Sequence, residues 1–531
     1  MKRFLCLFLA CILCCCGLCG CSKGDDAFVY AVSGTPDTLD PQLADSDVER
    51  ILAVNLFEGL FRLDAQGVVV PAACESWSVS GDGLTWTFTL REGLFYQTDP
   101  EEENAQPVPV TAQDYVFGLQ RLFAAGGSSP YRQSFLDLAG AEAIAAGEAA
   151  PETLGAYALN GRTLMLRLVA PDENLPRRLC CAGAMPCNKE FYEATDGTYG
   201  LEPDAVLCNG LFRLTLWSAE NGVTMRRTVP QEGMVNRVRL LPYAALHGDE
   251  APSAADRLAQ QLTGGEFISG VPQDASAPVF SVQTLQMVIN CRDALLANRN
   301  IRAGLAGVLY RSLPEELPEG WSTAQGLVPG SVSFGTKSWR DTAGSLLNAA
   351  LPDDGAQAYR QGLAELGKTK LSGIAVLVPD TEEWRSLYAA VTLGWQQQLS
   401  AFFSVQYLPE AEILSRVRAG DYDIAFLGSR TVQDDVPAAL AAYAQASTGN
   451  LTGYADAGFE ALLGEARTAA TVQQKQQLLR EAELLLLSSW SVVPIVTAAE
   501  YFAVSPGFSG VAASPFGPVL DFTAAATGQS S

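Results

Sequence analysis

The amino-terminal third of the chain alternates short apolar strands with amphipathic helices. In residues 84–90, Trp, Phe and Leu occupy every second position, and this pattern predicts a strand with one buried face. Apolar residues at helical spacing predict helices over residues 47–60 and 112–123. Further short strands are expected at residues 28–32, 68–70, 76–79 and 164–168.

The carboxyl-terminal half has a different pattern. Residues 374–378 form an uninterrupted apolar run, which is typical of a strand buried on both faces. The elements expected after it are a helix at 382–398, a strand at 404–408, a helix at 411–419 and a strand at 422–427. This β-α-β-α-β order predicts a sheet that is covered by helices on both faces. A helix at 471–488 and an apolar strand at 492–496 follow.

The amino terminus has the pattern of an export signal. A basic start precedes an apolar run at residues 4–18, which suits a signal-peptide core and is short for a membrane span. The run ends in Leu18-Cys19-Gly20-Cys21, which resembles the lipobox of bacterial lipoproteins. We therefore expect a lipoprotein signal peptide at 1–20, lipid attachment at Cys21 and a tether over 21–27. An ordinary cleaved signal with a cysteine-rich core is the alternative.

Length, charge and histidine content exclude several classes of function. A chain of 531 residues is too long for one compact domain, so two or three lobes are expected. Lys and Arg number 35 against 59 Asp and Glu, a formal charge of −24, which disfavours a nucleic-acid partner. His247 is the single histidine of the sequence, so HExxH zinc sites and multi-histidine metal sites are impossible. We expect this residue to lie exposed in a polar loop.

The part of the chain after the leader contains six of the 13 cysteines. A bridge between Cys187 and Cys208 is one possibility, since it would close a loop of about twenty residues and stabilise the fold by roughly 3 kcal/mol. Buried free thiols are the alternative. The cysteines concerned are Cys74, Cys180, Cys181, Cys187, Cys208 and Cys291.

Short motifs follow one another along the chain in a recognisable order. They are Leu39-Asp40-Pro41, Leu56-Phe57-Glu58-Gly59-Leu60, Cys74-Glu75-Ser76-Trp77, Asp82-Gly83-Leu84-Thr85-Trp86, Val110-Thr111-Ala112-Gln113-Asp114 with Arg121, Ser129-Pro130-Tyr131, Asn209-Gly210, Asn290 with Ile301-Arg302, Gly326-Leu327-Val328-Pro329, Asp421-Tyr422-Asp423, Gly449-Asn450 and Val493-Pro494-Ile495. As an ordered set over roughly residues 28–500, they resemble the extracellular solute-binding proteins of family 5. This family contains the oligopeptide- and dipeptide-binding subunits of ABC importers.

The resemblance implies an α/β, periplasmic-binding-protein-like fold (type II, cluster C), with two main lobes, a hinge and an extra small α+β domain. Lobe I would be discontinuous, and the extra domain II would be inserted in it. The implied boundaries are 28–65, 185–275 and 490–531 for lobe I, 66–184 for domain II and 276–489 for lobe III. Closure about the hinge would bury a ligand between the lobes.

The resemblance also indicates a ligand-binding loop. In oligopeptide binders, the aspartate that receives the peptide ammonium lies in a Gly-Trp-x-x-Asp-Tyr stretch. Here the stretch begins at Gly428, and Ser429 and Val432 replace the tryptophan and the aspartate. Either a neighbouring aspartate binds the peptide ammonium instead, or the ligand presents no amine at this place. In the second case Arg430 would favour an anionic group of the ligand. The candidates in this loop are Asp434, Asp435 and Arg430, with solvated loop residues as the alternative.

Three further residues carry over from the family more weakly. Tyr131 aligns with a pocket tyrosine, and Trp395 aligns with a pocket-wall tryptophan, although core packing is the common role of a helical tryptophan. Arg292 is a candidate for meeting a carboxylate, and a surface salt bridge with Asp293 is its alternative.

We therefore expect a substrate-binding lipoprotein of an ABC transporter. It would capture peptides, or a solute of similar size, between two lobes and deliver them to a membrane permease, without catalysis and without a cofactor. The implied partners are the permease and ATPase subunits and, through the lipid anchor, the cell membrane. The protein would be a monomer on the extracellular or periplasmic side of that membrane.

Two other functions remain open at this stage. One is a signalling or accessory receptor that keeps the fold without feeding a transporter, and the other is an importer of a non-peptide solute. An exported hydrolase is disfavoured, because the sequence has no Gly-x-Ser-x-Gly elbow, no histidine cluster and no glycine-rich phosphate loop.

Overall fold

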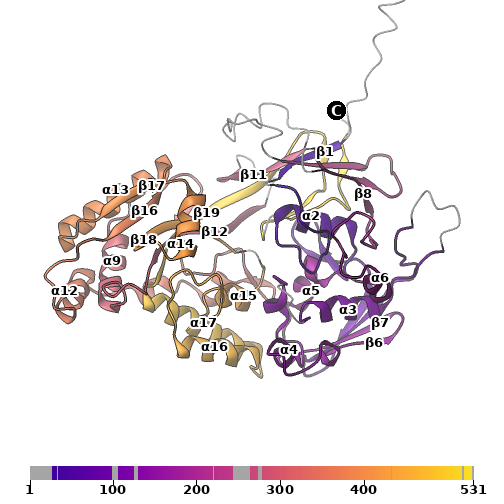
Figure 1. Cartoon of the computed structure of the whole chain (residues 1–531), viewed down its shortest axis with the longest axis horizontal. Coiled ribbons are helices and arrows are strands. Elements are labelled where there is room, and N and C mark those ends of the chain that lie inside the picture. The colour runs from indigo at the N-terminus through magenta and orange to yellow at the C-terminus, as the bar shows by residue number, and fades with distance from the viewer. Residues whose placement is uncertain are drawn as a thin grey trace, which may run out of the picture.

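The computed structural model describes residues 27–32, 34–98, 106–124, 129–218, 221–242, 264–272, 278–431, 433–516 and 519–528. The expected signal peptide, Cys21, His247 and Val432 lie outside these residues. Within them, no helix combines the length and apolarity that crossing a bilayer requires. Figure 1 shows two bulky parts, one formed mostly by the first half of the chain and the other by the second. They are joined by the short strand β11 and the long strands β12 and β19.

The second part is built on a seven-stranded sheet with the order β11-β19-β12-β18-β16-β17, in which β13 also pairs with β19. The strands are β11 (Gly265–Ser269), β12 (Val279–Ile289), β13 (Trp321–Thr323), β16 (Ala375–Pro379), β17 (Ser404–Leu408), β18 (Ile424–Arg430) and β19 (Val492–Val504). β16 runs parallel to both β17 and β18, whereas β12 is antiparallel to β18 and β19. The predicted β-α-β-α-β unit is thus present as a parallel three-stranded segment.

Both faces of this sheet are covered, as the apolar runs predict. Within β16, Val376 and Val378 pack into one core, and Leu377 packs into the other. Because side chains alternate along a strand, an uninterrupted apolar run supplies both faces. The covering helices include α9 (Arg299–Arg311), α12 (Gly355–Glu365), α13 (Glu382–Gly394), α14 (Glu410–Ala419), α15 (Val436–Ala441), α16 (Ala457–Arg467) and α17 (Val472–Ser489).

The first part contains a four-stranded sheet with the order β1-β10-β9-β8. Its strands are β1 (Ala27–Val32), β8 (Phe212–Ser218), β9 (Gly222–Arg227) and β10 (Arg237–Pro242). The sheet packs on α2 (Asp47–Leu56), and Leu520 and Phe522 from the carboxyl-terminal segment complete this core. Residues from both ends of the chain therefore share one core. The terminal strands are β20 (Phe508–Ser509), β21 (Ala512–Ser514), β22 (Val519–Asp521) and β23 (Ala526–Thr527).

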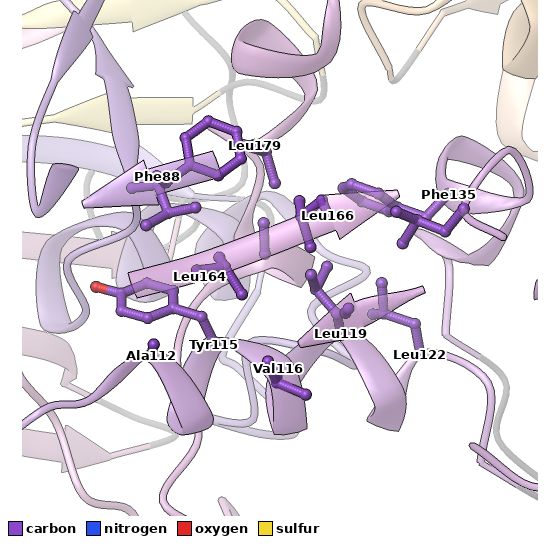
Figure 2. Packing of buried hydrophobic residues seen from close by; sticks show 14 of the residues in the cluster. Phe88, Ala112, Tyr115, Val116, Leu119, Leu122, Phe135, Leu164, Leu166 and Leu179 are labelled. Carbon is purple, nitrogen blue, oxygen red and sulfur yellow. The ribbon is translucent and has the colours of Figure 1, made fainter. Parts of the chain in front are cut away.

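A second small sheet, with the order β4-β5-β7-β6, lies beside the first. The strands are β4 (Cys74–Val79), β5 (Thr85–Leu90), β6 (Ala156–Asn160) and β7 (Thr163–Arg167), and α3 (Ala112–Arg121) covers one face. Figure 2 shows Tyr115 and Leu119 of α3 directed at Phe88, Leu164 and Leu166 of β5 and β7. The alternation read in residues 84–90 is confirmed, because Trp86, Phe88 and Leu90 are buried. Short neighbouring elements are β2 (Phe61–Leu63), β3 (Val69–Pro71), α4 (Ala141–Ala145), α5 (Leu175–Arg178) and α6 (Lys189–Ala194).

Two predicted boundaries are wrong. The helix expected over residues 47–60 ends at Leu56, because Phe57 is extended (φ −117°, ψ 158°) and turns the chain into β2. The strand expected over 492–496 continues to Val504, since it pairs first with β12 and then with β11. At the helix end the Leu56 carbonyl accepts from the Gly210 N–H at 2.7 Å. In both cases the partners are distant in sequence, so local periodicity does not report them.

Candidate functional site

A cavity lies where the two parts of the molecule meet. It encloses about 1220 Å³ of space, its solvent-open mouth included. Its wall includes parts of α2, residues 57–63, residues 131–134, residues 177–185, residues 210–211, the loop 433–435 before α15, and the carboxyl-terminal residues 512–516 and 519–523. Among the predicted site residues, the described wall includes Tyr131, Asp434 and Asp435. The structure therefore brings three of the predicted residues to one cavity from both parts of the chain.

Asp434 reaches the cavity already bound on both carboxylate oxygens. The backbone N–H of Ser333 donates to Oδ1 at 2.6 Å, and the Ser333 hydroxyl donates to Oδ2 at 3.1 Å. Arg177 of α5 donates to Oδ2 at 3.0 Å. Burial raises the pKa of this carboxyl group, and these donors act in the opposite direction. A ligand ammonium would have to displace Arg177 or Ser333, so the predicted role of Asp434 requires a rearrangement.

Asp435 begins α15, and its carboxylate accepts a hydrogen bond from the Ala438 N–H at 2.9 Å. It lies beside a buried group of charges in which Arg178 contacts Asp137 at 2.6 Å and Asp172 at 2.8 Å, and Lys475 contacts Asp172 at 3.5 Å. Burial raises the pKa of Asp435 to about 6, and repulsion by Asp172 adds to the effect, although Arg178 and Lys475 oppose it. With Asp435 ionised, the group holds three acids against two bases.

Replacement of Asp435 by asparagine tests this charge balance. Asparagine caps a helix as well as aspartate does, so α15 should keep its first turn. The folded pKa of about 6 exceeds the usual 3.8, so the wild-type protein gains stability as the pH falls from 7 toward 4. We subtract the free energy of unfolding of the wild type from that of the variant. This difference should be about 2 kcal/mol more favourable to the variant at pH 7.5 than at pH 4. Unfolding of both proteins at the two pH values measures this, and a pH-independent difference would contradict it.

Arg430 and Arg292 lie outside the described cavity wall. Arg430 ends β18, and its guanidinium is bound to Glu500 of β19 by two hydrogen bonds of 2.6 and 2.5 Å. Arg292 is exposed and packs over Gly453. Its expected salt bridge with Asp293 is not formed either, since that carboxylate accepts from the N–H groups of Leu295 and Leu296. The predicted ligand roles of the two arginines thus find no support in their positions.

The expectation that Trp395 forms a pocket wall is wrong. Its exposed fraction is 0%, and its indole N–H donates to the Leu305 carbonyl of α9 at 2.9 Å. A buried indole with a satisfied donor is a core residue, which was the alternative. Tyr131 is also buried, and its hydroxyl donates to the Ala44 carbonyl at 2.8 Å, but its ring borders the cavity. Its ligand role stays a prediction.

The predicted bridge between Cys187 and Cys208 is also wrong, because both are free thiols. The Cys187 sulfur faces Arg121 at 3.6 Å, and the backbone of Cys208 is held by the Gln97 N–H at 2.7 Å. Separate anchors thus hold the two residues. Burial raises the pKa of the Cys187 thiol to about 11 and that of Cys208 to about 12, so both stay protonated at neutral pH.

Sequence reasoning missed several residues of the cavity wall. Arg177 and Arg178 follow a proline in a segment without periodicity, so no local signal marks them. Arg62 and Asp521 each lie next to a buried aromatic residue, Phe61 and Phe522, and this alternation was the available signal. Among the described residues, no group of His, Cys, Asp and Glu is arranged to hold a metal ion.

Comparison with known proteins identifies the family. Residues 68–450 match the bacterial extracellular solute-binding proteins, family 5, middle region. The oligopeptide-binding protein OppA of Bacillus subtilis (strain 168) is 24% identical over 511 residues, which cover 92% of this chain and 91% of OppA. The probable deoxycholate-binding periplasmic protein YgiS of Escherichia coli (strain K12) is 24% identical over 490 residues, covering 88% of this chain and 87% of YgiS.

The fold agrees with this assignment. The substrate-binding domain of the oligopeptide ABC transporter from Bacillus anthracis str. Ames superimposes with a TM-score of 0.72 at 23% identity, covering 96% of this chain and 99% of that structure. The expected α/β fold of the periplasmic-binding-protein type is therefore confirmed. With the family match extending over most of the chain, this protein belongs to the bacterial extracellular solute-binding proteins of family 5.

Proposed function

We propose that this protein is the substrate-binding subunit of an ABC importer and that it captures peptides. The observation that carries the proposal is the cavity, which is enclosed by residues from the amino-terminal part, the loop 433–435 and the carboxyl-terminal segment. A site walled by both parts of the chain suits capture by closure. The names of OppA and of the Bacillus anthracis protein support peptide as the cargo. The protein binds and releases its cargo, and no reaction is proposed for it.

The proposed lobes follow the sequence boundaries: 28–65, 185–275 and 490–531 for lobe I, 66–184 for domain II and 276–489 for lobe III. β19 supports a hinge between lobes I and III, because it enters from the large sheet and its residues Phe502 and Val504 reach the core around β1. β11 also links the two sheets, because it pairs with β19 and the preceding Gly264 forms a bridge with Val29 of β1. Strands that cross between two cores can bend at the crossing while each core stays intact.

Export and anchoring belong to the same proposal. The basic start, the apolar run and the Leu18-Cys19-Gly20-Cys21 motif support a lipoprotein signal peptide with lipid attachment at Cys21. The protein would then be a monomer held outside the cell membrane, next to the permease and ATPase subunits that it serves.

A non-peptide amphipathic solute is the second candidate cargo. The cavity wall has an apolar side formed by Phe57, Phe61, Leu63, Met185 and Phe516, and the sequence has Val432 where the oligopeptide binders place their ammonium-binding aspartate. YgiS is named for a bile acid, so relatives differ in named cargo. A receptor that keeps the fold without import would share this binding site and differ only in its partners.

Native mass spectrometry of residues 22–531, purified from a peptide-rich medium, tests the cargo. We expect a mass excess distributed over many short peptides, which mild denaturation removes. A Leu211→Trp variant should retain much less cargo, because Leu211 lies on the cavity wall and its side chain is 42% exposed there. Leu216→Trp is the matched control, since Leu216 is 41% exposed on β8 and lies off the wall.

The outcomes separate the candidates. One discrete non-peptide mass in the wild type, lost in Leu211→Trp, would replace peptide by the second cargo. A clean apo mass with no thermal stabilisation by any peptide pool would contradict peptide capture and favour the receptor.

A further inference from the structure

Most charged side chains of the cavity wall are already bound to partners. Arg50 pairs with Asp47 at 2.7 Å, and Glu58 pairs with Arg91 at 2.6 Å. Arg177 pairs with Asp434 at 3.0 Å, and Arg178 pairs with Asp137 and Asp172. Asp435 is bound to the first turn of α15. Arg62 and Asp521 remain, and in the described part of the chain neither makes an ion pair with another side chain. The wall thus has one cation and one anion available to a ligand.

The carboxylate of Asp521 is aimed at the cavity by its strand. Leu520 and Phe522, its neighbours in sequence, are both 0% exposed and pack into the core around β1. Side chains alternate along a strand, so Asp521 of β22 faces the opposite way, toward the cavity that it lines. Asn55 of α2 fixes this orientation, because its side chain accepts from the Phe522 N–H at 2.9 Å and donates to the Leu520 carbonyl at 2.7 Å.

The environment of Asp521 favours a cationic ligand group. The Thr523 N–H donates to its Oδ1 at 2.7 Å. Burial raises the pKa of this carboxyl group, and the hydrogen bonds from Thr523 and then the charges of Arg62 and Arg227 offset part of the rise. Neither arginine contacts it as an ion pair. A carboxylate that is withdrawn from water and lacks a direct counter-ion gains most from a cation that binds beside it.

Arg62 is held in a similar way on β2. Its neighbour Phe61 is 1% exposed in the core of the small β4-β5-β7-β6 sheet, and Arg62 pairs with Val70 of β3 in the backbone register. Arg62 is half-buried and lines the cavity, as do both of its neighbours in β2, Phe61 and Leu63. The same wall includes the apolar side chains of Phe57, Leu63 and Val519.

We propose that Asp521 and Arg62 are the two charged contacts of the ligand, with Asp521 receiving an ammonium group and Arg62 a carboxylate. The cargo is then a zwitterion with an apolar body, and a short apolar peptide with free ends has this chemistry. The inference rests on the proposed function and refines it, because it moves the ammonium site from the loop 433–435 to the carboxyl-terminal segment. It also explains how this chain could bind a peptide ammonium although Val432 replaces the ammonium-binding aspartate of the oligopeptide binders.

Calorimetric titration with three probes tests the assignment: the tripeptide Leu-Leu-Leu with free ends, its N-acetylated form and its carboxyl-terminal amide. We expect Asp521→Asn to weaken binding of the free peptide at least about tenfold. N-acetylation should weaken binding to the wild type by a similar factor and have little further effect on the variant. Arg62→Gln should likewise weaken binding of the free peptide. Amidation of the carboxyl terminus should weaken binding to the wild type and have little further effect on this variant. Asp434→Asn tests the competing ammonium site, and Glu481→Gln, an exposed change on α17, is the matched control.

The outcomes are distinct. If the wild type binds the free peptide and Asp521→Asn binds it equally well, the inference is overturned and peptide capture stands. If Asp434→Asn rather than Asp521→Asn removes the effect of N-acetylation, the ammonium site is in the loop. If the wild type binds none of the probes, the inference is overturned, and the native mass spectrum then decides separately whether peptide capture stands. Thermal unfolding of each variant shows that it is folded, and Asp521→Asn should melt no lower than the wild type because it removes an unpaired charge.

Discussion

Replacement of Glu483 by alanine is expected to lower the free energy of unfolding of the second part of the molecule by about 3 to 5 kcal/mol. Glu483 lies on α17 with an exposed fraction of 0%. Its Oε1 accepts from the N–H groups of Leu327 and Val328 at 2.7 and 3.0 Å. Its Oε2 accepts from the Trp339 indole at 2.7 Å and from the guanidinium of Arg340. The substitution would leave a buried cation and three buried donors without their acceptor.

Hydrogen exchange provides the sharpest measurement of this effect. The amides of Leu327 and Val328 should lose protection in the variant, because the carboxylate of Glu483 is their acceptor. Glu481→Ala is the matched control: it is two residues away on the same helix, exposed, and bonded only to Gln477 at 2.6 Å. We expect the control to change the free energy of unfolding by less than about 0.5 kcal/mol. Unchanged exchange at residues 327 and 328 in Glu483→Ala would show that the carboxylate does not hold this segment.

The second large effect is expected for Arg178→Met. The side chain of Arg178 is 4% exposed and contacts Asp137 at 2.6 Å and Asp172 at 2.8 Å, and it also donates to the Ser134 carbonyl. Methionine fills a similar volume without charge, so the variant leaves buried carboxylates facing Lys475 alone. We expect a loss of about 3 to 5 kcal/mol at pH 7.5.

The loss should be smaller at low pH. Burial opposes ionisation of Asp172, yet Lys475 and Arg178 together hold its pKa below the usual 3.8. Without Arg178 this pKa rises, so the variant recovers stability as the pH falls toward 4 and the carboxylate takes up a proton. Denaturant unfolding at pH 7.5 and 4.5 measures both values. Equal losses at the two pH values would contradict the account based on unpaired charge.

Arg467→Ala is the control for Arg178→Met. Arg467 of α16 also makes an ion pair, with Glu142 of α4 at 2.6 Å, but the two side chains are 30% and 55% exposed. Exposed ion pairs contribute about 0 to 1 kcal/mol, so this variant should unfold almost as the wild type does. The contrast between the two arginines isolates burial as the cause.

The local pattern of the chain predicted the secondary structure well where one periodicity continued without interruption. The apolar run at 374–378 and the alternation at 84–90 are such segments, and both are strands in the sheets expected from their patterns. Ser46 and Glu49 begin α2 with a capping box, which is again a local signal. The order of the motifs predicted the family, because each motif is short and contiguous.

The residues of the site could not be predicted in the same way. Asp434 was expected to bind ligand, but Arg177, 257 positions earlier in the chain, already holds its carboxylate. Trp395 was assigned to a pocket wall, but α9 supplies the carbonyl that binds its indole. A sequence shows which groups can pair, but it does not show which distant group each of them contacts in the folded structure.

The sequence by itself determined the family, the α/β class and the strands and helices that repeat along it, because hydrophobic periodicity and turn residues act over neighbouring positions. Only the tertiary structure decided which charges remain available in the cavity. Asp434 lies between Gln433 and a second acid, and Asp521 lies between two apolar residues, and neither pattern shows which carboxylate a ligand can reach. The fold places Arg177 and Ser333 against one of them and an open cavity against the other. The physical reason is that desolvation and pairing depend on contacts between segments hundreds of residues apart.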